Sequence, residues 1–236
     1  MKNIFIIFLI FLTKNIYAAA PPINDKPLPP TPYIMSDISN LSMSVKWDKA
    51  TIKKFLPEKF WNEKNLYGGI TVFNSKKKQA FSPLSGTYAW INIKNSKEEE
   101  SRLVFFSVFG KSELLYKVMT KTYSLDSLKG ASKITLINNK ITARTNIEGK
   151  NSINIQLSIS EDCKKENGSF TFINYKNKNK ESISKIGWES STVCKADLIS
   201  TKFKSPIEKI KISEVLGIKF MTNLKLNYQA PAITNE

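Results

Sequence analysis

Apolar and polar residues alternate with a period of two through most of this chain, a pattern typical of β-strands that bury one face. The pattern is clearest in residues 133–159, which alternate in three segments separated by turn residues. The first turn is Asn138-Asn139, and asparagine tolerates the positive φ angles that a two-residue hairpin turn requires. We therefore predict an antiparallel meander here, with one face in water. Residues 103–109 are apolar almost throughout, which predicts a central strand buried on both faces.

Two segments carry helix signals in place of this alternation. In residues 49–56, apolar positions recur with helical spacing between a capping Asp48 and a terminating Pro57. Residues 205–217 begin with a capping serine and a proline and end at a glycine, which predicts a second short helix. Many short strands and two short helices predict a mainly β fold, a closed or nearly closed antiparallel barrel formed by a single domain over residues 41–236.

Residues 1–18 have the layout of a secretory signal peptide. A short positive start precedes an apolar run of nine residues, and small residues follow it. The run is too short to span a bilayer, with an uncleaved membrane anchor as the alternative. Residues 19–40 are rich in proline, which favours an extended arm on the surface over a helix or a central strand. We predict an exported mature chain, periplasmic or secreted, without a transmembrane segment.

Cys163 and Cys194 are the two cysteines of the chain. An even pair in an exported protein predicts a disulfide, with one reactive thiol as the alternative. Residues 174–185 lie between the two cysteines and are rich in lysine, asparagine and serine. We therefore predict a solvated loop whose two sides are tied together by the disulfide.

The chain contains no histidine. A Ser-His-Asp triad, a Cys-His dyad and a histidine-ligated metal site are therefore excluded, and two cysteines cannot by themselves hold a structural zinc ion or an iron–sulfur cluster. The chain also lacks the glycine-rich motifs for dinucleotides and phosphates, so we predict no metal and no cofactor. Lysine amines that form Schiff bases, and pairs of carboxylates, are the remaining candidates for chemistry.

Lysine and arginine outnumber aspartate and glutamate by 36 to 20, which gives a net charge of +16. Only Arg102 and Arg144 are arginines, whereas proteins that recognise nucleic acids rely heavily on arginine. The lysine-rich runs at 76–78 and 176–180 are interpreted as solvated loops. We predict no specific nucleic-acid partner, with a weak, salt-sensitive attraction to anionic surfaces as the alternative.

Two stretches carry a family resemblance. Residues 43–60 read Met-Ser-Val-Lys-Trp-Asp-Lys-Ala-Thr-Ile-Lys-Lys-Phe-Leu-Pro-Glu-Lys-Phe, and residues 205–220 read Ser-Pro-Ile-Glu-Lys-Ile-Lys-Ile-Ser-Glu-Val-Leu-Gly-Ile-Lys-Phe, followed by Leu224. The first is similar to the opening strand, short helix and Leu-Pro-Glu turn of the acetoacetate decarboxylase-like family, and the second to its C-terminal turn and last strand. The resemblance implies a cone-like β-barrel with an apolar cavity. In active members a cavity lysine forms a Schiff base with a β-keto acid, assisted by a second lysine, a glutamate and an arginine.

The chain departs from the family in its catalytic motif. The family carries Gly-Arg-Glu and then Gly-x-Pro-Lys-Lys, whereas residues 110–121 lack the arginine, the Gly-x-Pro and the adjacent lysine pair. The resemblance leaves Lys117, Lys121 and Glu113 as candidate catalytic residues, because the two lysines would lie one turn apart on a helix. A solvated surface position is the alternative for each lysine.

The candidate cavity residues are aromatic, with core packing as the alternative role for each: Trp90, Phe105, Phe106, Phe109 and Tyr116. The first functional hypothesis is an exported acetoacetate decarboxylase-like protein whose cavity binds a small apolar or keto-acid ligand. The sequence leaves open whether the protein is a Schiff-base lyase. The alternatives are a non-enzymatic barrel that binds a lipid-like or other apolar ligand, and a basic secreted protein that binds surfaces.

Overall fold

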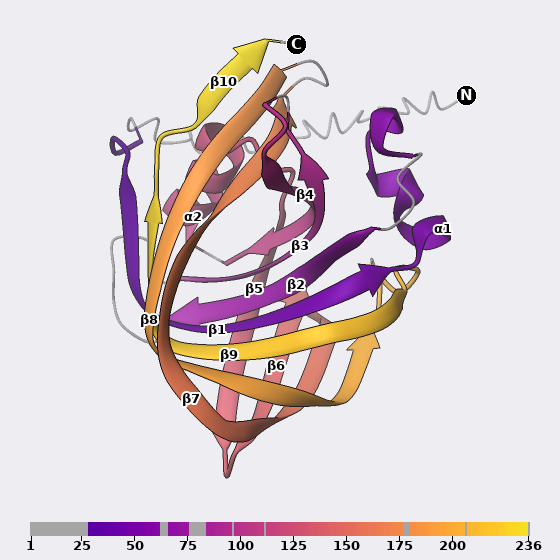
Figure 1. The fold of residues 1–236 in the computed structure, drawn as a ribbon, viewed down its shortest axis with the longest axis vertical. Helices are drawn as coiled ribbons and strands as arrows, with labels where there is room; N and C mark the ends of the chain where they lie inside the picture. Colours follow the sequence, from indigo (N-terminus) through magenta and orange to yellow (C-terminus); the bar gives the residue numbers. More distant parts are fainter. Residues whose placement is uncertain are drawn as a thin grey trace, which may run out of the picture.

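The computed structural model describes residues 28–61, 66–75, 84–95, 97–110, 112–176, 180–205 and 207–235. The predicted signal peptide, residues 1–18, and the lysine run at 76–78 lie outside these ranges. The element order is shown in Figure 1. The strands are β1 (Tyr33–Trp47), β2 (Tyr67–Ser75), β3 (Ser85–Lys94), β4 (Glu100–Phe109), β5 (Leu128–Ile137), β6 (Lys140–Ile147), β7 (Lys150–Lys176), β8 (Lys180–Phe203), β9 (Ile212–Tyr228) and β10 (Ala232–Asn235). The helical turns are α1 (Lys49–Ile52), η1 (Lys53–Phe55), η2 (Glu58–Phe60), α2 (Glu113–Lys117) and η3 (Val118–Thr122).

The strands form one sheet that curls into a nearly closed ring (Figure 1). Neighbours along the sheet are β10, β8, β7, β6, β5, β4, β3, β2, β1 and β9 in that order, and β9 also pairs with β8. The pairs are antiparallel except that β4 runs parallel to β5 and to β7, each time over only two residue pairs. This architecture confirms the predicted mainly β, nearly closed barrel with two short α-helices.

The predicted meander is confirmed in β5, β6 and the start of β7. Asn138 and Asn139 connect β5 to β6 with φ angles of 47° and 61°, as a tight hairpin turn requires. Glu148 and Gly149, at φ angles of 51° and 80°, make the second turn into β7. Asparagine and glycine adopt the left-handed region at low cost, and each turn contains at least one of them, which is why the sequence located both turns.

Alternate residues of the strands supply two hydrophobic cores. Leu41, Met43 and Val45 of β1 are buried in the first core, with residues of β2, β3, β6 and β7. The second core contains Tyr33 and Met35 from the start of β1, with residues of β3, α2, η3, β8 and β9. Strand β1 therefore contributes to both cores, and only part of one of its faces is left for polar residues.

The proline-rich segment ends earlier than predicted. The predicted surface arm covers residues 19–40, but β1 begins at Tyr33, directly after Pro32. Tyr33 and Ile38 are buried, and both lie opposite β9. The prediction was wrong for residues 33–40, because the prolines that prevent pairing stop at position 32. The strand pairs with β9 from Tyr33 onward and with β2 from Ile38 onward.

One of the two predicted helices is misplaced. α1 and its continuation η1 confirm the helix predicted at 49–56, and the Asp48 carboxylate caps it by accepting an amide hydrogen bond at 3.0 Å. The helix predicted at 205–217 is wrong, because β9 begins at Ile212 and pairs there with β1. Pairing with a neighbouring strand satisfies the backbone of this segment, which outweighs a local helix signal. The second α-helix is α2, capped by Ser112.

The solvated loop predicted at residues 174–185 is also wrong. Most of this segment belongs to the ends of β7 and β8, and the connection at 177–179 lies outside the described residues. Asn174 is buried and donates a hydrogen bond to the carbonyl of Tyr123 at 3.1 Å, and Ser182 is buried as well. The polar composition suggested a loop in water, whereas these polar side chains are buried in the structure.

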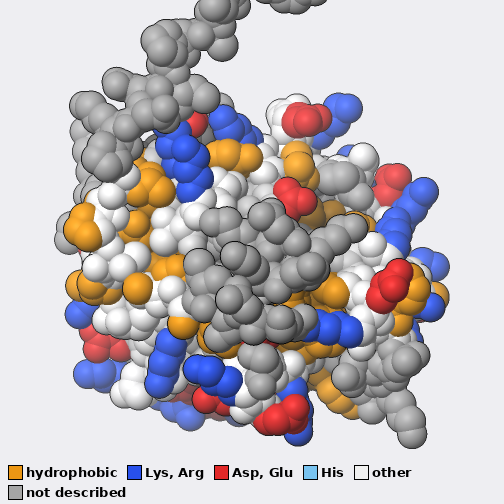
Figure 2. Space-filling view, turned by 90° about the horizontal axis from the view of Figure 1, so that it is seen from above, with side chains coloured by type: hydrophobic (Ala, Val, Ile, Leu, Met, Phe, Trp, Pro, Cys, Tyr) orange, Lys and Arg blue, Asp and Glu red, His pale blue; other side chains and the backbone are white. Residues whose placement is uncertain are grey.

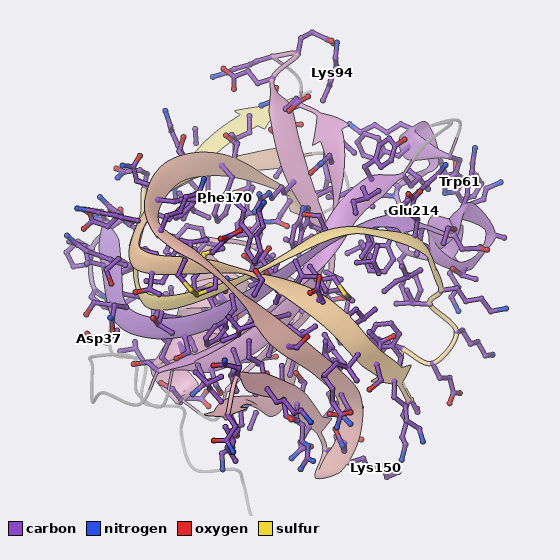
Figure 3. The ribbon with its side chains drawn as sticks, turned by 60° about the horizontal axis from the view of Figure 1, so that its bottom comes forward. Asp37, Trp61, Lys94, Lys150, Phe170 and Glu214 are labelled. Carbon is purple, nitrogen blue, oxygen red and sulfur yellow. A yellow bond between two sulfur atoms is a disulfide. The ribbon has the colours of Figure 1, made fainter. Side chains whose placement is uncertain are left out.

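The helical turns α1, η1 and η2 cover one end of the barrel. The amide of Lys211 donates to Thr51 Oγ1 at 3.1 Å, and the amide of Asp48 donates to the carbonyl of Lys211 at 3.0 Å. Figure 3 shows Trp61, just after η2, and Glu214, near the start of β9, at this same end. The helical turns thus tie the segment before β9 to the rest of the ring.

The predicted disulfide is confirmed. Cys163 of β7 and Cys194 of β8 lie directly opposite each other and are bonded, with an S–S distance of 2.03 Å. The register shifts immediately before this pair, because residues 160–162 of β7 face a single residue of β8. The disulfide therefore joins the two strands next to an irregularity in their pairing.

Candidate ligand-binding cavity

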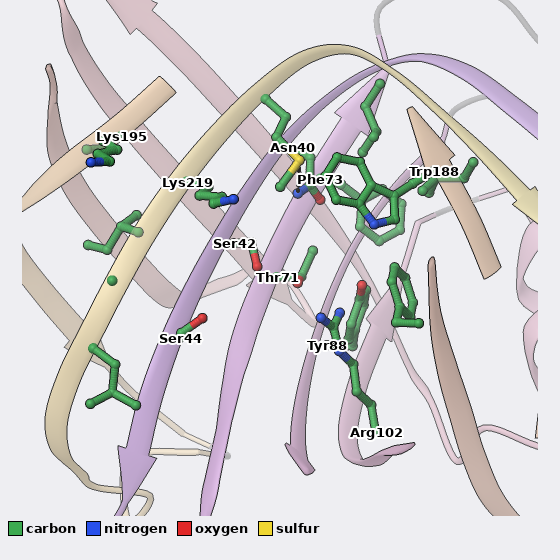
Figure 4. A pocket seen from close by; sticks show the side chains of 18 of the residues that line it. Asn40, Ser42, Ser44, Thr71, Phe73, Tyr88, Arg102, Trp188, Lys195 and Lys219 are labelled. Carbon is green, nitrogen blue, oxygen red and sulfur yellow. Dashed lines mark hydrogen bonds between the residues drawn. The ribbon is translucent and has the colours of Figure 1, made fainter. Parts of the chain in front are cut away.

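A cavity of about 590 Å³ lies against the sheet at β1, β2, β3 and β9 (Figure 4). One wall is polar and comes from two neighbouring strands, with Asn40, Ser42 and Ser44 in β1 and Thr71 in β2. The alternation of β1 explains this wall, because the residues between the serines turn to the first core. The polar positions of this strand therefore meet the cavity.

Aromatic side chains make up another part of the cavity lining. It is lined by Phe73 of β2, Tyr88 of β3, Phe170 of β7, Trp188 of β8 and Tyr228 of β9. Tyr88 and Phe170 are linked through Phe172, whose ring meets Tyr88 edge to face at 5.2 Å between centroids. The lining is thus a mixture of polar and aromatic side chains, whereas the sequence predicted an apolar cavity.

Arg102 of β4 brings a positive charge into the cavity wall. Its guanidinium carbon lies 4.2 Å from the centre of the Phe170 ring and 4.8 Å from the Trp90 ring. Among the described residues, no carboxylate forms an ion pair with Arg102. A half-buried cation held between aromatic rings without a counter-ion favours the arrival of an anion from solution.

The electrostatics around Arg102 are consistent with a site for an anion. Burial lowers the pKa of Arg102, although a guanidinium stays protonated in proteins. Burial raises the pKa of Tyr88, opposed by the positive charge of Arg102 and by a side-chain hydrogen bond with Thr71. Burial also raises the pKa of Tyr228 well above its usual value. Both phenols are therefore neutral at physiological pH and can donate hydrogen bonds to an acceptor in the cavity.

The cavity opens where β8 and β9 separate. Their pairing ends at Lys195 and Lys219. Beyond this pair, β8 is hydrogen-bonded only to β7, and β9 only to β1. Lys219 Nζ lies 2.6 Å from one carboxylate oxygen of Glu166, and Lys164 Nζ lies 3.3 Å from the other. The hydrogen bond from Lys219, followed by that from Lys164, lowers the pKa of Glu166 against the opposing effect of burial. Both Lys195 and Lys219 line the cavity at this opening, which we call the mouth.

The predicted catalytic residues lie outside the cavity. Glu113 and Lys117 belong to α2 and Lys121 to η3, so the two lysines do lie one turn apart. None of the three lines the cavity. Glu113 is exposed and pairs with Lys129 at 3.4 Å on the surface.

None of the predicted cavity residues lines the cavity. Trp90 is buried behind Arg102, and Phe109 packs against Phe73 with 6.2 Å between ring centroids. Phe105 meets Trp47 edge to face at 5.3 Å. Phe106 is buried in the first core. Tyr116 donates a hydrogen bond to the carbonyl of Ser127 at 3.1 Å.

Sequence reasoning missed the polar wall and Arg102. The serines of β1 alternate with apolar residues in a way that suggests a face in water, so only tertiary structure shows that they meet a cavity. Arg102 offered a usable signal, since it is one of two arginines in a lysine-rich chain and stands at the start of an apolar strand. Its companion Arg144 is exposed on β6, so composition alone did not separate them.

Within the described ranges, no helix is both long and apolar enough to cross a membrane. The same residues contain no group of three or more cysteine, aspartate or glutamate side chains placed to hold a metal ion.

Neither a family model nor a curated protein matches the sequence of this chain. Solved structures match its fold, among them the following three. The acetoacetate decarboxylase of Legionella pneumophila is 8% identical with a TM-score of 0.67, over 87% of this chain and 88% of its own. The enduracididine biosynthesis enzyme MppR, in complex with the condensation product of pyruvate and imidazole 4-carboxaldehyde, is 8% identical with a TM-score of 0.62, over 88% and 91%. An acetoacetate decarboxylase-like enzyme from Sphingomonas wittichii is 9% identical with a TM-score of 0.58, over 93% and 98%. At such low identity the likeness concerns the fold, and by that measure the chain has the fold of acetoacetate decarboxylase.

Proposed function

We propose that the protein is exported and binds a small organic carboxylate of the keto-acid class in its cavity. The observation that carries this proposal is Arg102, a guanidinium in the cavity wall with no carboxylate partner among the described residues. A guanidinium presents paired N–H donors that match the two oxygens of a carboxylate. Export is supported by the disulfide and by the apolar run that opens the chain.

The remaining lining suits the rest of such a ligand. Tyr88, as a neutral phenol beside Arg102, would donate a hydrogen bond to a keto oxygen. Thr71 and Ser42 supply further hydroxyls, and Phe73 and Trp188 supply apolar contact. Two of the matching structures bear on this assignment by name, since acetoacetate and pyruvate are both keto acids.

Binding of a keto acid predicts a direct effect of removing the guanidinium. We expect Arg102→Met to weaken binding of pyruvate or acetoacetate at least about tenfold, because a charge-assisted carboxylate contact is lost. Arg144→Met is the matched control, since Arg144 is exposed on β6 and lies outside the cavity lining. Isothermal titration calorimetry on the mature, disulfide-bonded protein measures both variants, and Arg102→Lys retains the charge if the methionine variant fails to fold. Equal affinities for wild type and Arg102→Met, or no binding by the wild type, would contradict the proposal.

A Schiff-base lyase is the second candidate, favoured by the fold shared with a decarboxylase. Such chemistry needs a lysine amine that condenses with the ligand carbonyl and releases water. In the described lining, Lys195 and Lys219 carry the amines, and Lys117 and Lys121 are the candidates outside it.

Borohydride trapping separates a lyase from a carrier. The mature protein is incubated with acetoacetate, reduced with borohydride and digested, and the adduct is located by peptide mass. An adduct on Lys195 or Lys219 that disappears on substitution by glutamine supports a lyase built on the cavity, and one on Lys117 or Lys121 supports a lyase built on α2 and η3. Binding without any adduct supports a carrier, and lipid that co-purifies with the protein would point to an apolar ligand in its place.

A further inference from the structure

A continuous row of register partners crosses the cavity. Tyr88 of β3 lies opposite Thr71 of β2, Thr71 opposite Ser42 of β1, Ser42 opposite Lys219 of β9, and Lys219 opposite Lys195 of β8. All five residues line the cavity. Because partners in register point to the same side of a sheet, these five positions form one polar track through the site.

The track runs from the interior to the surface. Tyr88 and Thr71 are buried, Ser42 is half-buried, and Lys219 and Lys195 are exposed. It crosses four gaps between strands, which corresponds to roughly 19 Å along the sheet at ordinary strand spacing. The curvature of the sheet and the reach of the side chains make the usable length shorter. Even so, the track is longer than a molecule the size of acetoacetate needs.

Positively charged side chains lie at both ends of this track. Arg102 lies beside Tyr88 at the inner end, and Lys195 and Lys219 lie opposite each other in register at the mouth. In Figure 4 both lysines are on the left of the view, away from Arg102. Two like charges in register on neighbouring strands repel each other. Glu166 is paired with Lys219 and Lys164, whereas Lys195 has no ion pair among the described residues. Among the described residues of the lining, Asp197 is the one acid, so cations outnumber acids there.

We propose that the natural ligand is an elongated acid with two anionic groups. One carboxylate is bound by Arg102 and the second anionic group by Lys195 and Lys219, while the chain between them lies along Thr71 and Ser42. This inference rests on the proposed function, since it takes Arg102 as the receptor of the first carboxylate. It explains why two lysines stand opposite each other at the mouth, because an anion between them offsets their repulsion.

The test compares straight-chain dicarboxylates, from succinate to dodecanedioate, with the monocarboxylates of the same chain lengths. Isothermal titration calorimetry gives the affinity of each for the mature, disulfide-bonded protein. At one intermediate length we expect the dicarboxylate to bind at least about tenfold more tightly than its monocarboxylate partner, as a second charge-assisted contact provides. We expect this gain to vanish in the double variant Lys195→Gln/Lys219→Gln, so that the dicarboxylate binds no more tightly than the monocarboxylate of the same length. Both lysines are exposed, so the double variant is expected to fold.

Lys202→Gln is the matched control, because Lys202 is an exposed lysine of the same strand, β8, outside the cavity lining. A dicarboxylate gain that survives in the double variant, or that Lys202→Gln removes as well, overturns the inference. Equal affinities for mono- and dicarboxylates that both depend on Arg102 overturn it too, and leave the proposed function standing. If no acid binds the wild type, or if Arg102→Met changes nothing, the proposed function fails and this inference fails with it.

Discussion

At the scale of single residues, Gly69 leaves space for a side chain that supports the candidate site. Gly69 of β2 lies opposite Trp90 of β3, and a Cβ atom at this position would come within 2.6 Å of the indole ring. The missing side chain therefore leaves the space that the indole fills. Because the indole supports the guanidinium of Arg102, this glycine acts on the cavity through two contacts in series.

Gly69→Ala is expected to destabilise the fold by about 1–3 kcal/mol, the usual cost of forcing an atom into a packed site. It should also weaken carboxylate binding, because the displaced indole no longer supports Arg102. Gly187→Ala on β8 is the control, since a Cβ atom there meets nothing within 4 Å. Urea unfolding measures both variants, and an alanine at position 69 as stable as the wild type would refute this account.

At the scale of elements, β7 and β8 each change pairing partners along their length. The first part of β7 pairs with β6, and its far end touches β4. The first residues of β8, 180–183, pair with β10 and β7, residues 186–195 pair with β9 and β7, and the last residues, 196–203, pair with β7 alone. The disulfide lies at this change of partner, next to Lys195. The long hairpin therefore needs a fixed point where the ring begins to open, and the Cys163–Cys194 bond provides it.

Removing the disulfide is expected to lower stability by about 3.5 kcal/mol at most, from the chain-entropy cost of a closed loop of this length. The cysteines are 31 positions apart in the sequence. The measurement is urea unfolding of the wild type with and without dithiothreitol. The double variant Cys163→Ser/Cys194→Ser should match the reduced wild type and ignore the reductant. A wild type whose unfolding midpoint is the same in both buffers would count against a stabilising bond.

The local features of the elements could be predicted from the sequence. The secondary structure of a segment could not be predicted where it depends on pairing with a distant part of the chain. Asn138-Asn139 marked a turn because its requirement is local, and Asp48 marked a helix start for the same reason. The segment after Ser205 carried an equally good helix signal, but pairing with β1 made it a strand. No local pattern contains that pairing.

The candidate site was harder to predict than the fold. The family motif points to Lys117, Lys121 and Glu113 as catalytic residues. Their segment is helical, as expected if the two lysines lie one turn apart. The cavity, however, lies where β1, β2 and β9 meet, a position fixed only when the ring forms. Arg102 of β4 and Ser42 of β1 line the same cavity only because the ring closes.

At the scale of the whole molecule, charge and burial act in different places. The net charge is +16, yet Figure 2 shows lysine and acidic side chains interspersed on the visible face. The groups with strongly raised pKa values are tyrosines of the second core, where burial raises the pKa of Tyr123 and Tyr228. Tyr123 and Tyr228 meet edge to face, with 5.4 Å between centroids. Ionisation of this interior, more than surface charge, is expected to limit stability in alkali.

The pH dependence follows from the sign of these shifts. A tyrosine whose pKa is raised by folding contributes stability that is fully present below the unfolded pKa and is lost as pH rises toward the folded value. We therefore expect the free energy of unfolding to fall from about pH 10 upward. Tyr228→Phe should flatten this decline, whereas Tyr67→Phe, at an exposed position, should leave it unchanged. Urea midpoints measured across the alkaline range give the result, and an unaltered slope in Tyr228→Phe would argue against the core tyrosines as its cause.

The parting of β8 and β9 also bears on how the cavity could be reshaped. The size of the mouth depends on where hydrogen bonding between β8 and β9 stops, which is at the Lys195–Lys219 pair. Moving that stopping point by one residue pair lengthens or shortens the opening by a strand repeat of about 3.3 Å, while the remainder of the barrel keeps its pairing. Selectivity for molecular size can therefore change through the length of one ladder, without new loops.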